Sequence, residues 1–383
     1  MRFLRRLTHW VTFRRLALIV TTTVVFAQIA GPKLSCELRA VLVLLRLSGI
    51  ENGYTRALSH PIAREDASVL GPEGPRRARM YVPSDAPPRV GLVLLHGIHK
   101  KGIDEPRLVH LAEAFAAAGY AVLTPELQSI TDYRIDKAET KVIGAAARML
   151  SSRLGGVKVG LVGTSFAGGL ALVTANEAEF RNTIGCVLAI GAHHDLVRVS
   201  RFFMTSRAVA PDRVLPLQAH NYGVMVTVYG HAKFFFPENE ATAAHDALKL
   251  WLNDDWDGAR NLAATLTPPT RDRLDALFHE RAESVQGDYE RVVDFEKGAL
   301  LAASPSGHLA GVTAKVFVLH GAGDSVVPAT EAEWLRQDLG ERVDGFLVTK
   351  AIEHVEISKA KKTDLLELVH FIARMLERAD AMR

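Results

Sequence analysis

The sequence predicts an α/β protein in which helices flank a mostly parallel central sheet and a helical insertion interrupts the chain. Apolar runs alternate with segments of helical periodicity over residues 66–195 and again over 313–380, as in strands joined by crossover helices. Several runs are continuously apolar, as expected of strands buried on both faces. Residues 196–312 lack this alternation. A structureless loop of that length is improbable in a compact domain, so we expect a helical cap there.

The individual elements of the two alternating blocks follow from their periodicity and their glycine stops. Strands are expected at 79–83, 90–97, 120–126, 157–163, 184–192, 314–321 and 344–349. Helices are expected at 105–119, 136–156, 330–339 and 362–379, with a further helix rich in small residues after Ser165. Within the insertion, residues 241–253 and 271–283 have helical spacing, and its aromatic clusters suggest an apolar substrate moiety or simply packed helices.

Composition and charge exclude several classes of protein. The chain has 383 residues, 48% of them hydrophobic and 23% charged, which is ordinary for a globular protein. Residues 1–50 carry eight basic side chains and one acidic, so 38 basic and 42 acidic side chains remain, a net charge of −4. That balance does not favour a nucleic-acid partner. Cys36 and Cys186 form neither a disulfide framework nor a metal-ligand cluster.

The first fifty residues predict membrane association. Five arginines precede the uncharged run at 16–30, which spans about 22 Å as a helix, short of the roughly 30 Å hydrocarbon core. Three interpretations remain open: an anchor, a cleaved signal segment that would export the protein, or a helix of a soluble protein. Residues 38–50 form a second apolar stretch broken by Arg39 and Arg46, a spacing typical of a helix that lies on a surface. We expect membrane attachment, on a side that the sequence leaves open.

A candidate nucleophile lies in the stretch "VGLVGTSFAGG" at 159–169. A sharp turn from strand to helix strains the backbone of the nucleophile and demands small neighbours two residues away on either side. Gly163 and Ala167 meet that demand around Ser165. The turn would place Ser165 at a helix N-terminus, where the Phe166 amide could bind an oxyanion. The Ile98 amide, in the loop after the strand at 90–97, is the expected second donor, with His99 as the alternative.

A serine nucleophile needs a base and an acid, and two later segments supply them. An imidazole must take the hydroxyl proton, and a carboxylate must orient the imidazole. Asp324 follows a strand in "VLHGAGDSVVP", and His354 follows the last strand in "TKAIEHVEIS". The order Ser165, Asp324, His354 is the order expected when all three lie at the carboxyl ends of parallel strands. These three residues are therefore the predicted catalytic set.

Other assignments of the nearby polar residues are weaker. Asp195 also follows a strand and could orient His354 in place of Asp324. A metal site built from His193, His194 and Asp195 would need three consecutive side chains to turn toward one ion, so we expect solvated imidazoles at a loop rim. His96 and His99 flank the proposed oxyanion loop and are better explained by shaping it than by a direct catalytic role.

The motifs "HG" at 96–97, "GTSFAGG", "HGAGDSVVP" and "EHVE" together resemble the α/β-hydrolase superfamily over roughly 66–195 and 313–380. Ala167 replaces the usual glycine, and no long glycine-rich oxyanion loop follows His96-Gly97. The resemblance implies a serine hydrolase that cleaves a small carboxylic ester or related acyl compound through an acyl-enzyme, without cofactor or metal. An acyltransferase with the same residues, or a catalytically silent member that binds a ligand, are the alternatives. The sequence carries no signal for a particular oligomeric state.

Overall fold

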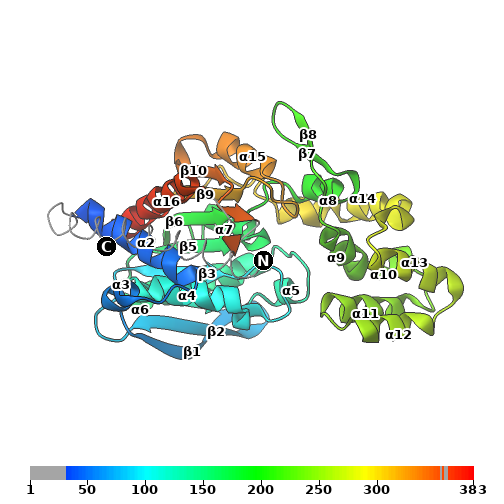
Figure 1. Cartoon of the computed structure of the whole chain (residues 1–383), viewed down its shortest axis with the longest axis horizontal. Coiled ribbons are helices and arrows are strands. Elements are labelled where there is room, and N and C mark those ends of the chain that lie inside the picture. Colours follow the sequence, from blue (N-terminus) through cyan, green and yellow to red (C-terminus); the bar gives the residue numbers. More distant parts are fainter. Residues whose placement is uncertain (1–31, 354–355, 358–360) are drawn as a thin grey trace, which may run out of the picture.

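The computed structural model describes residues 32–353, 356–357 and 361–383. The apolar run at 16–30 and His354 therefore lie outside the described residues. An eight-stranded sheet organises the chain, with strand order β1-β2-β4-β3-β5-β6-β9-β10 (Figure 1). Only β1 with β2 and β2 with β4 pair antiparallel; the remaining neighbours are parallel. This architecture confirms the predicted fold class.

The strands lie close to the ranges expected from the apolar runs. They are β1 (Ile62–Gly71), β2 (Gly74–Pro83), β3 (Gly91–Leu95), β4 (Ala121–Pro125), β5 (Val159–Thr164), β6 (Ile184–Ile190), β9 (Lys315–Gly321) and β10 (Val343–Thr349). Strand β1 has no counterpart among the expected elements, because its central residues are charged and exposed. It forms an antiparallel hairpin with β2 at the sheet edge, so the sheet begins at residue 62 rather than 66.

Helices cover both faces of the sheet, and alternate strand residues point into two separate cores. Val93 and Leu95 belong to the core beneath α6 (Glu139–Arg153), α7 (Phe166–Asn176) and α15 (Thr330–Leu339). Leu92 and Leu94 belong to the core beneath α4 (Pro106–Ala117), α16 (Lys362–Asp380) and α2 (Pro32–Leu47). Short helices α3 (Gly53–Leu58) and α5 (Gln128–Thr131) and the paired strands β11 (Ile352–Glu353) and β12 (Glu356–Ile357) complete this part.

The segment between β6 and β9 is helical except for one small hairpin, and Figure 1 shows it projecting to one side of the sheet. Its helices are α8 (Leu196–Thr205), α9 (Tyr222–Gly230), α10 (Ala232–Phe235), α11 (Ala241–Leu252), α12 (Trp256–Ala264), α13 (Pro268–Phe278) and α14 (Gln286–Ala302). The hairpin pairs β7 (Arg207–Val209) with β8 (Val214–Pro216). Trp251 stacks on Phe278 with ring centroids 4.2 Å apart, so aromatic side chains pack this insertion internally.

Helix α2 packs against the protein itself. Leu42 and Val43 are each 1% exposed and lie against α4 and α16. Arg39 forms an ion pair of 2.7 Å with Asp380 and donates a hydrogen bond of 2.6 Å to the Tyr120 hydroxyl. The interpretation of residues 38–50 as a helix lying on a membrane surface is therefore wrong for these side chains, because the protein core already buries them.

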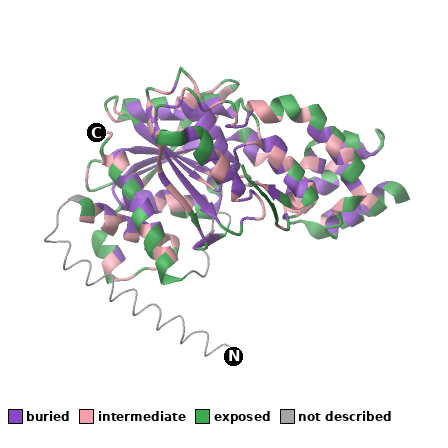
Figure 2. Ribbon diagram, turned by 90° about the horizontal axis from the view of Figure 1, so that it is seen from above, coloured by how far each residue is buried: buried purple, intermediate pink, exposed green. Residues whose placement is uncertain are grey.

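Membrane attachment otherwise depends on residues 1–31, which lie outside the described part. In the part of the chain that the structure describes, no helix has both the length and the apolar character that a membrane span requires. Figure 2 shows the described residues of the N-terminal region as a helix against the sheet-bearing part, with exposed and buried faces. Attachment through residues 16–30 stays a prediction from the sequence.

Candidate active site

Ser165 occupies a strained turn between β5 and α7. Its backbone has φ 55° and ψ −133°, in a region that residues with a side chain rarely adopt. Its N–H donates a hydrogen bond of 2.7 Å to the carbonyl oxygen of Ile190 in the neighbouring strand β6. The residue is only 4% exposed. The turn therefore has the geometry of a nucleophile elbow, and the surrounding fold over-determines it.

The glycines around Ser165 are required by close packing of the turn. A Cβ on Gly163 would lie 2.6 Å from the Gly168 Cα and 2.7 Å from the Ala167 carbonyl oxygen, so helix α7 starts directly against the end of β5. A Cβ on Gly169 would lie 2.1 Å from the His193 ring. Ala167, by contrast, is fully buried with its methyl group accommodated. The crowding of small residues therefore has a separate steric cause at each position.

The loop after β3 lies against this turn. A Cβ on Gly97 would be 3.4 Å from the Cβ of Ser165. His96 anchors the loop: its Nε2 accepts a hydrogen bond of 3.0 Å from the Leu127 amide, and its Nδ1 lies 2.9 Å from the Gly97 carbonyl oxygen. Burial lowers the His96 pKa to about 4, so the ring is neutral at pH 7. His96 thus has the structural role expected for it.

The predicted oxyanion donors lie on the two segments that meet at Ser165. Phe166 is the first residue of α7, and the first amides of a helix have no carbonyl partner within that helix. Ile98 follows Gly97 and borders the same cavity as Ser165. His99, the alternative supplier, accepts a hydrogen bond of 3.1 Å at Nδ1 from the Lys101 amide. The His99 ring therefore stabilises the turn that follows β3.

Asp324 is held in the turn after β9 and is 1% exposed. Its Oδ1 accepts hydrogen bonds of 2.9 Å from the amides of both Val326 and Val327. The Nε2 of His320 lies 3.5 Å from its Oδ2 and 2.8 Å from the Val327 carbonyl oxygen. These contacts with neighbouring protein atoms fix the orientation of the Asp324 carboxylate. The sequence analysis had no signal for His320 as a partner of this turn.

His354 follows β10 in the sequence, and one cavity is bordered by Ser165 and by residues close in sequence to Asp324 and His354. That cavity is lined by Ser165, by Val326, two residues after Asp324, and by Ile352, two residues before His354. Strands β5, β6, β9 and β10 are adjacent and parallel, so their carboxyl ends lie at the same edge of the sheet. The position of the His354 side chain is outside the described residues.

The rival residues after β6 have other partners. Asp195 caps α8 by accepting a hydrogen bond of 3.0 Å from the Arg198 amide. His194 bonds Asp338 through Nε2 at 2.7 Å, while the His193 Nε2 lies 3.3 Å from the Ala303 carbonyl oxygen. Both imidazoles are buried, so the expectation of solvated rings at a rim is wrong. Among the described residues, no group of three His, Cys, Asp or Glu side chains could hold a metal ion.

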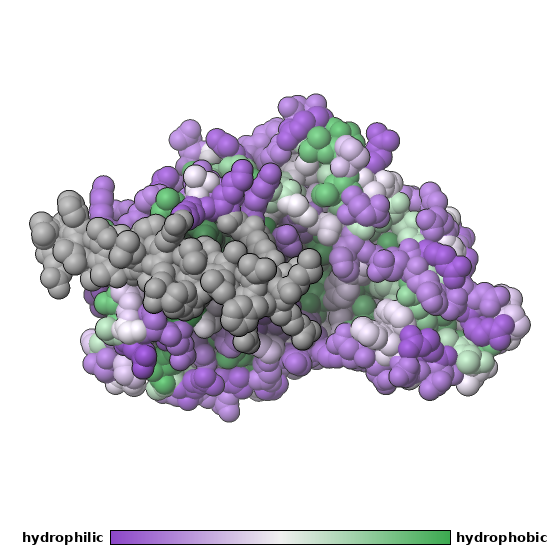
Figure 3. Space-filling model, in the orientation of Figure 1, coloured by the Kyte–Doolittle hydropathy of each residue, from purple (hydrophilic) through white to green (hydrophobic). Residues whose placement is uncertain are grey.

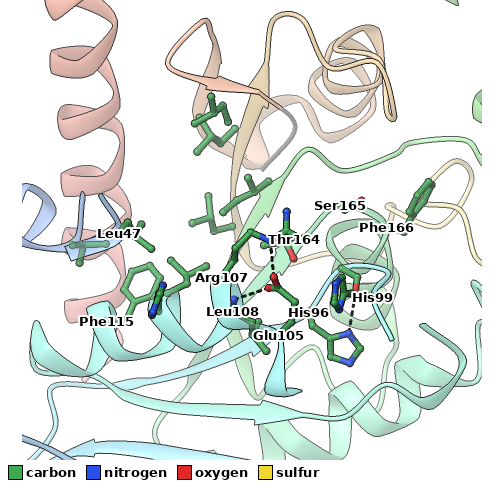
Figure 4. A pocket seen from close by; sticks show the side chains of 18 of the residues that line it. Leu47, His96, His99, Glu105, Arg107, Leu108, Phe115, Thr164, Ser165 and Phe166 are labelled. Carbon is green, nitrogen blue, oxygen red and sulfur yellow. Dashed lines mark hydrogen bonds and ion pairs between the residues drawn. The ribbon is translucent and has the colours of Figure 1, made fainter. Parts of the chain in front are cut away.

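Two cavities meet beside Ser165. The larger, of about 870 Å³, extends from Ser165 to α2, α4 and α16, and Figure 4 shows Leu47 and Phe115 on one side of the view and Ser165 and Phe166 on the other. The smaller, of about 500 Å³, lies between the sheet-bearing part and helices α8, α9 and α14. The aromatic clusters of the insertion had suggested an apolar substrate moiety or packed helices. The apolar residues of α2 instead line the larger cavity, which the sequence analysis missed.

Comparisons with known proteins assign no activity to this chain. No protein-family model matches the chain, and the curated proteins contain no significant match. Among solved structures, it is similar to an esterase of Pyrobaculum calidifontis, with 15% identity over 91% of each chain and a TM-score of 0.47. The esterase domain of a Rhodothermus marinus protein has 15% identity over 82% of this chain and 96% of that chain, with a TM-score of 0.44.

An acylaminoacyl peptidase of Pyrococcus horikoshii has 10% identity over 85% of this chain and 42% of that chain, with a TM-score of 0.47. At these values, none of the similarities transfers an activity to this chain. The strand order, the parallel pairing around β5 and the turn at Ser165 are those of the α/β-hydrolase fold. The class of protein is therefore established at the level of fold, and the activity is a separate question.

Proposed function

We propose that the protein is a serine hydrolase that cleaves a carboxylic ester or related acyl compound, with Ser165 as nucleophile, His354 as base and Asp324 as the carboxylate that orients the base. The observation that carries this proposal is the strained turn at Ser165, with φ 55° at the start of α7 and the Gly97 loop against it. Strain of this kind persists where the surrounding structure enforces it, and it clusters at active sites.

The proposed reaction has two steps. His354 takes the proton of the Ser165 hydroxyl as its oxygen attacks the acyl carbon, and the amides of Phe166 and Ile98 hold the developing oxyanion. His354 then gives the proton to the leaving alcohol, which departs and leaves an acyl-enzyme. Water then attacks the same carbon while His354 takes one of its protons; the bond from the acyl carbon to the Ser165 Oγ breaks, His354 returns the proton to that oxygen, and the carboxylic acid departs. The fixed carboxylate of Asp324 would keep the imidazole in the correct orientation throughout.

A fluorophosphonate probe tests the nucleophile directly, because it reacts covalently with activated serines. We expect stoichiometric labelling of the wild-type protein and none of Ser165→Ala, while the exposed Ser68→Ala variant labels normally. Undiminished labelling of Ser165→Ala would overturn the assignment. Product analysis with a short-chain ester in water, with and without a competing alcohol, separates hydrolysis from acyl transfer: the free acid dominates if the protein is a hydrolase.

A further inference from the structure

The larger cavity is bounded mainly by apolar side chains from elements far apart in the sequence. Val43, Leu44 and Leu47 of α2 form one wall, and side chains of α4, α16 and the adjacent face of the sheet form the others. The lining of α4 runs from Leu108 to Phe115, which is about 10 Å along a helix that rises 1.5 Å per residue. A site of this size and character suits an elongated apolar group.

The charged groups at this cavity are already compensated. Glu105 accepts hydrogen bonds from the Arg107 guanidinium at 2.6 Å and from the Leu108 amide at 2.9 Å. Burial raises the pKa of Glu105, but these hydrogen bonds outweigh burial and the net pKa is lowered. Figure 4 shows the carboxylate directed toward these two partners. An apolar chain that lies along Leu108, Leu111 and Phe115 would therefore leave these bonds intact.

The smaller cavity has a different lining, although it shares a boundary with the larger one. Ile98, Phe166, Tyr222 and Val326 border both cavities, so the two meet beside Ser165. The lining of the smaller cavity combines charged side chains, among them Arg134, Lys137 and Glu296, with apolar ones, among them Phe203 and Val226. Figure 3 shows mostly hydrophilic surface on the helical insertion, with apolar atoms in the depression beside it. The two halves of an ester would therefore lie in two cavities on either side of the acyl carbon, of which the one that reaches α2 is the larger.

We propose that the cavity between α2, α4 and α16 is an acyl-chain site, so that the substrate is an ester of an apolar, elongated carboxylic acid whose alcohol half lies in the smaller cavity. This inference rests on the proposed serine hydrolase function and names its substrate class. The alcohol leaves first, while the acyl group must stay attached to Ser165 until water arrives. The larger cavity, whose far wall is helix α2, has room for an elongated half that stays bound, and the smaller cavity takes the half that departs.

Helix α2 becomes the specificity element of the enzyme under this proposal. Its ion pair from Arg39 to Asp380 and the Arg39 hydrogen bond to Tyr120 hold it against the end of α16 and the segment after α4. The wall that contacts the chain is therefore fixed to the body of the protein. Changing the volume of a side chain on this wall should change the preferred chain length and leave the chemistry at Ser165 intact.

The test measures kcat/KM for two ester series on the full chain: one varies the acyl chain with a constant alcohol, and the other varies the alcohol with a constant short acyl group. In the wild type, kcat/KM should rise about fourfold per methylene along the acyl series until the cavity is filled. Leu111→Trp and Leu47→Trp should lower kcat/KM for long acyl chains at least tenfold and leave short esters within threefold. Val226→Trp, which fills the smaller cavity, is the matched control and should keep the acyl-chain profile.

The acyl-site assignment would be overturned if kcat/KM of the wild type did not change with acyl-chain length. It would also be overturned if Leu111→Trp lowered kcat/KM for long alcohols rather than for long acyl chains. A fall in kcat/KM that is equal for short and long acyl chains in Leu111→Trp and Leu47→Trp would overturn it as well. Binding of a fluorescent fatty acid to Ser165→Ala gives a readout independent of turnover: we expect saturable binding that Leu111→Trp weakens at least tenfold. Labelling by fluorophosphonate with no chain preference and no fatty-acid binding would contradict only this inference. Absence of labelling would contradict the proposed function instead.

Discussion

The amide of Ser165 donates a 2.7 Å hydrogen bond to the carbonyl oxygen of Ile190, at the end of the neighbouring strand. This bond ties the strained turn to the edge of the sheet. A non-glycine residue at positive φ costs about 1–3 kcal/mol and persists only where its surroundings enforce it. Here the enforcement comes from β6 on one side and from the tight start of α7 on the other. The position of the hydroxyl therefore depends on neighbours with no chemical role.

Gly163→Ala should displace that hydroxyl. The added methyl group would lie within 2.7 Å of backbone atoms of Ala167 and Gly168, so the turn itself must move. A shift of about 1 Å at a catalytic group costs roughly 100-fold in rate. We expect at least that loss in kcat against short esters, with slower fluorophosphonate labelling. Ala167→Gly, which removes a methyl group on the same turn, should keep activity within tenfold; wild-type rates in Gly163→Ala would refute the steric argument.

Asp324→Asn should nearly abolish turnover. An amide cannot stabilise the imidazolium or hold the required tautomer, and the equivalent change in a serine–histidine–carboxylate set lowers kcat about 10⁴-fold. Asp195→Asn is the matched control, because asparagine caps a helix as well as aspartate does. It should keep kcat within a few-fold. The reverse ranking of the two variants, measured with one short ester, would transfer the acid role to Asp195.

Glu331→Gln should destabilise the protein strongly. The Glu331 side chain is fully buried and bonds the Arg198 guanidinium at 2.6 and 2.9 Å, while its Oε2 also accepts the amides of His194 and Asp195. Removing one partner of a buried ion pair costs about 3–5 kcal/mol in the free energy of unfolding. Denaturant unfolding should show this loss. Glu333→Gln removes an exposed pair with Arg213 and should cost under about 1 kcal/mol; equal effects would contradict the prediction.

Stability should fall in mild acid because of His96 and His193. Burial lowers both pKa values to about 4, from about 6.5 in the unfolded chain. The unfolded state therefore binds more protons between these pH values, so the free energy of unfolding decreases as pH falls from about 6.5 to about 4. Each residue contributes about 2 kcal/mol of this loss by pH 4.5. Urea unfolding at pH 7 and pH 4.5 measures the change.

The variant His96→Asn gives the control for the acid effect. It should be less stable than the wild type at pH 7, because its side chain is too short for the bond from the Leu127 amide. It should also lose about 2 kcal/mol less than the wild type between pH 7 and pH 4.5. An identical pH dependence in variant and wild type would show that His96 does not titrate as its burial implies.

Several elements could be predicted because their signals are local. The continuous apolar run before Ser165 indicated a buried strand, and the spacing of Gly163 and Ala167 indicated the sharp turn after it. Asp324 could be located because its turn follows another apolar strand. Strand β1 could not be predicted in this way, because its exposed charges hide the alternation that marks a strand. The prediction of a surface helix at residues 38–50 was wrong for the opposite reason. An apolar helix face has the same sequence pattern whether protein or membrane covers it.

The sequence by itself determined the order of strands and helices, the helical insertion and the segments that carry Ser165, Asp324 and His354, because these depend on periodicity and turn chemistry among near neighbours. Tertiary structure alone decided that α2 covers α4 and α16, that His193 packs on Gly169, and that a cavity runs from Ser165 to Leu47. Such contacts join residues that are not near neighbours in the sequence, and in the case of α2 and α16 they join elements from opposite ends of the chain. Their partners follow from how the layers pack, which no short stretch of sequence encodes.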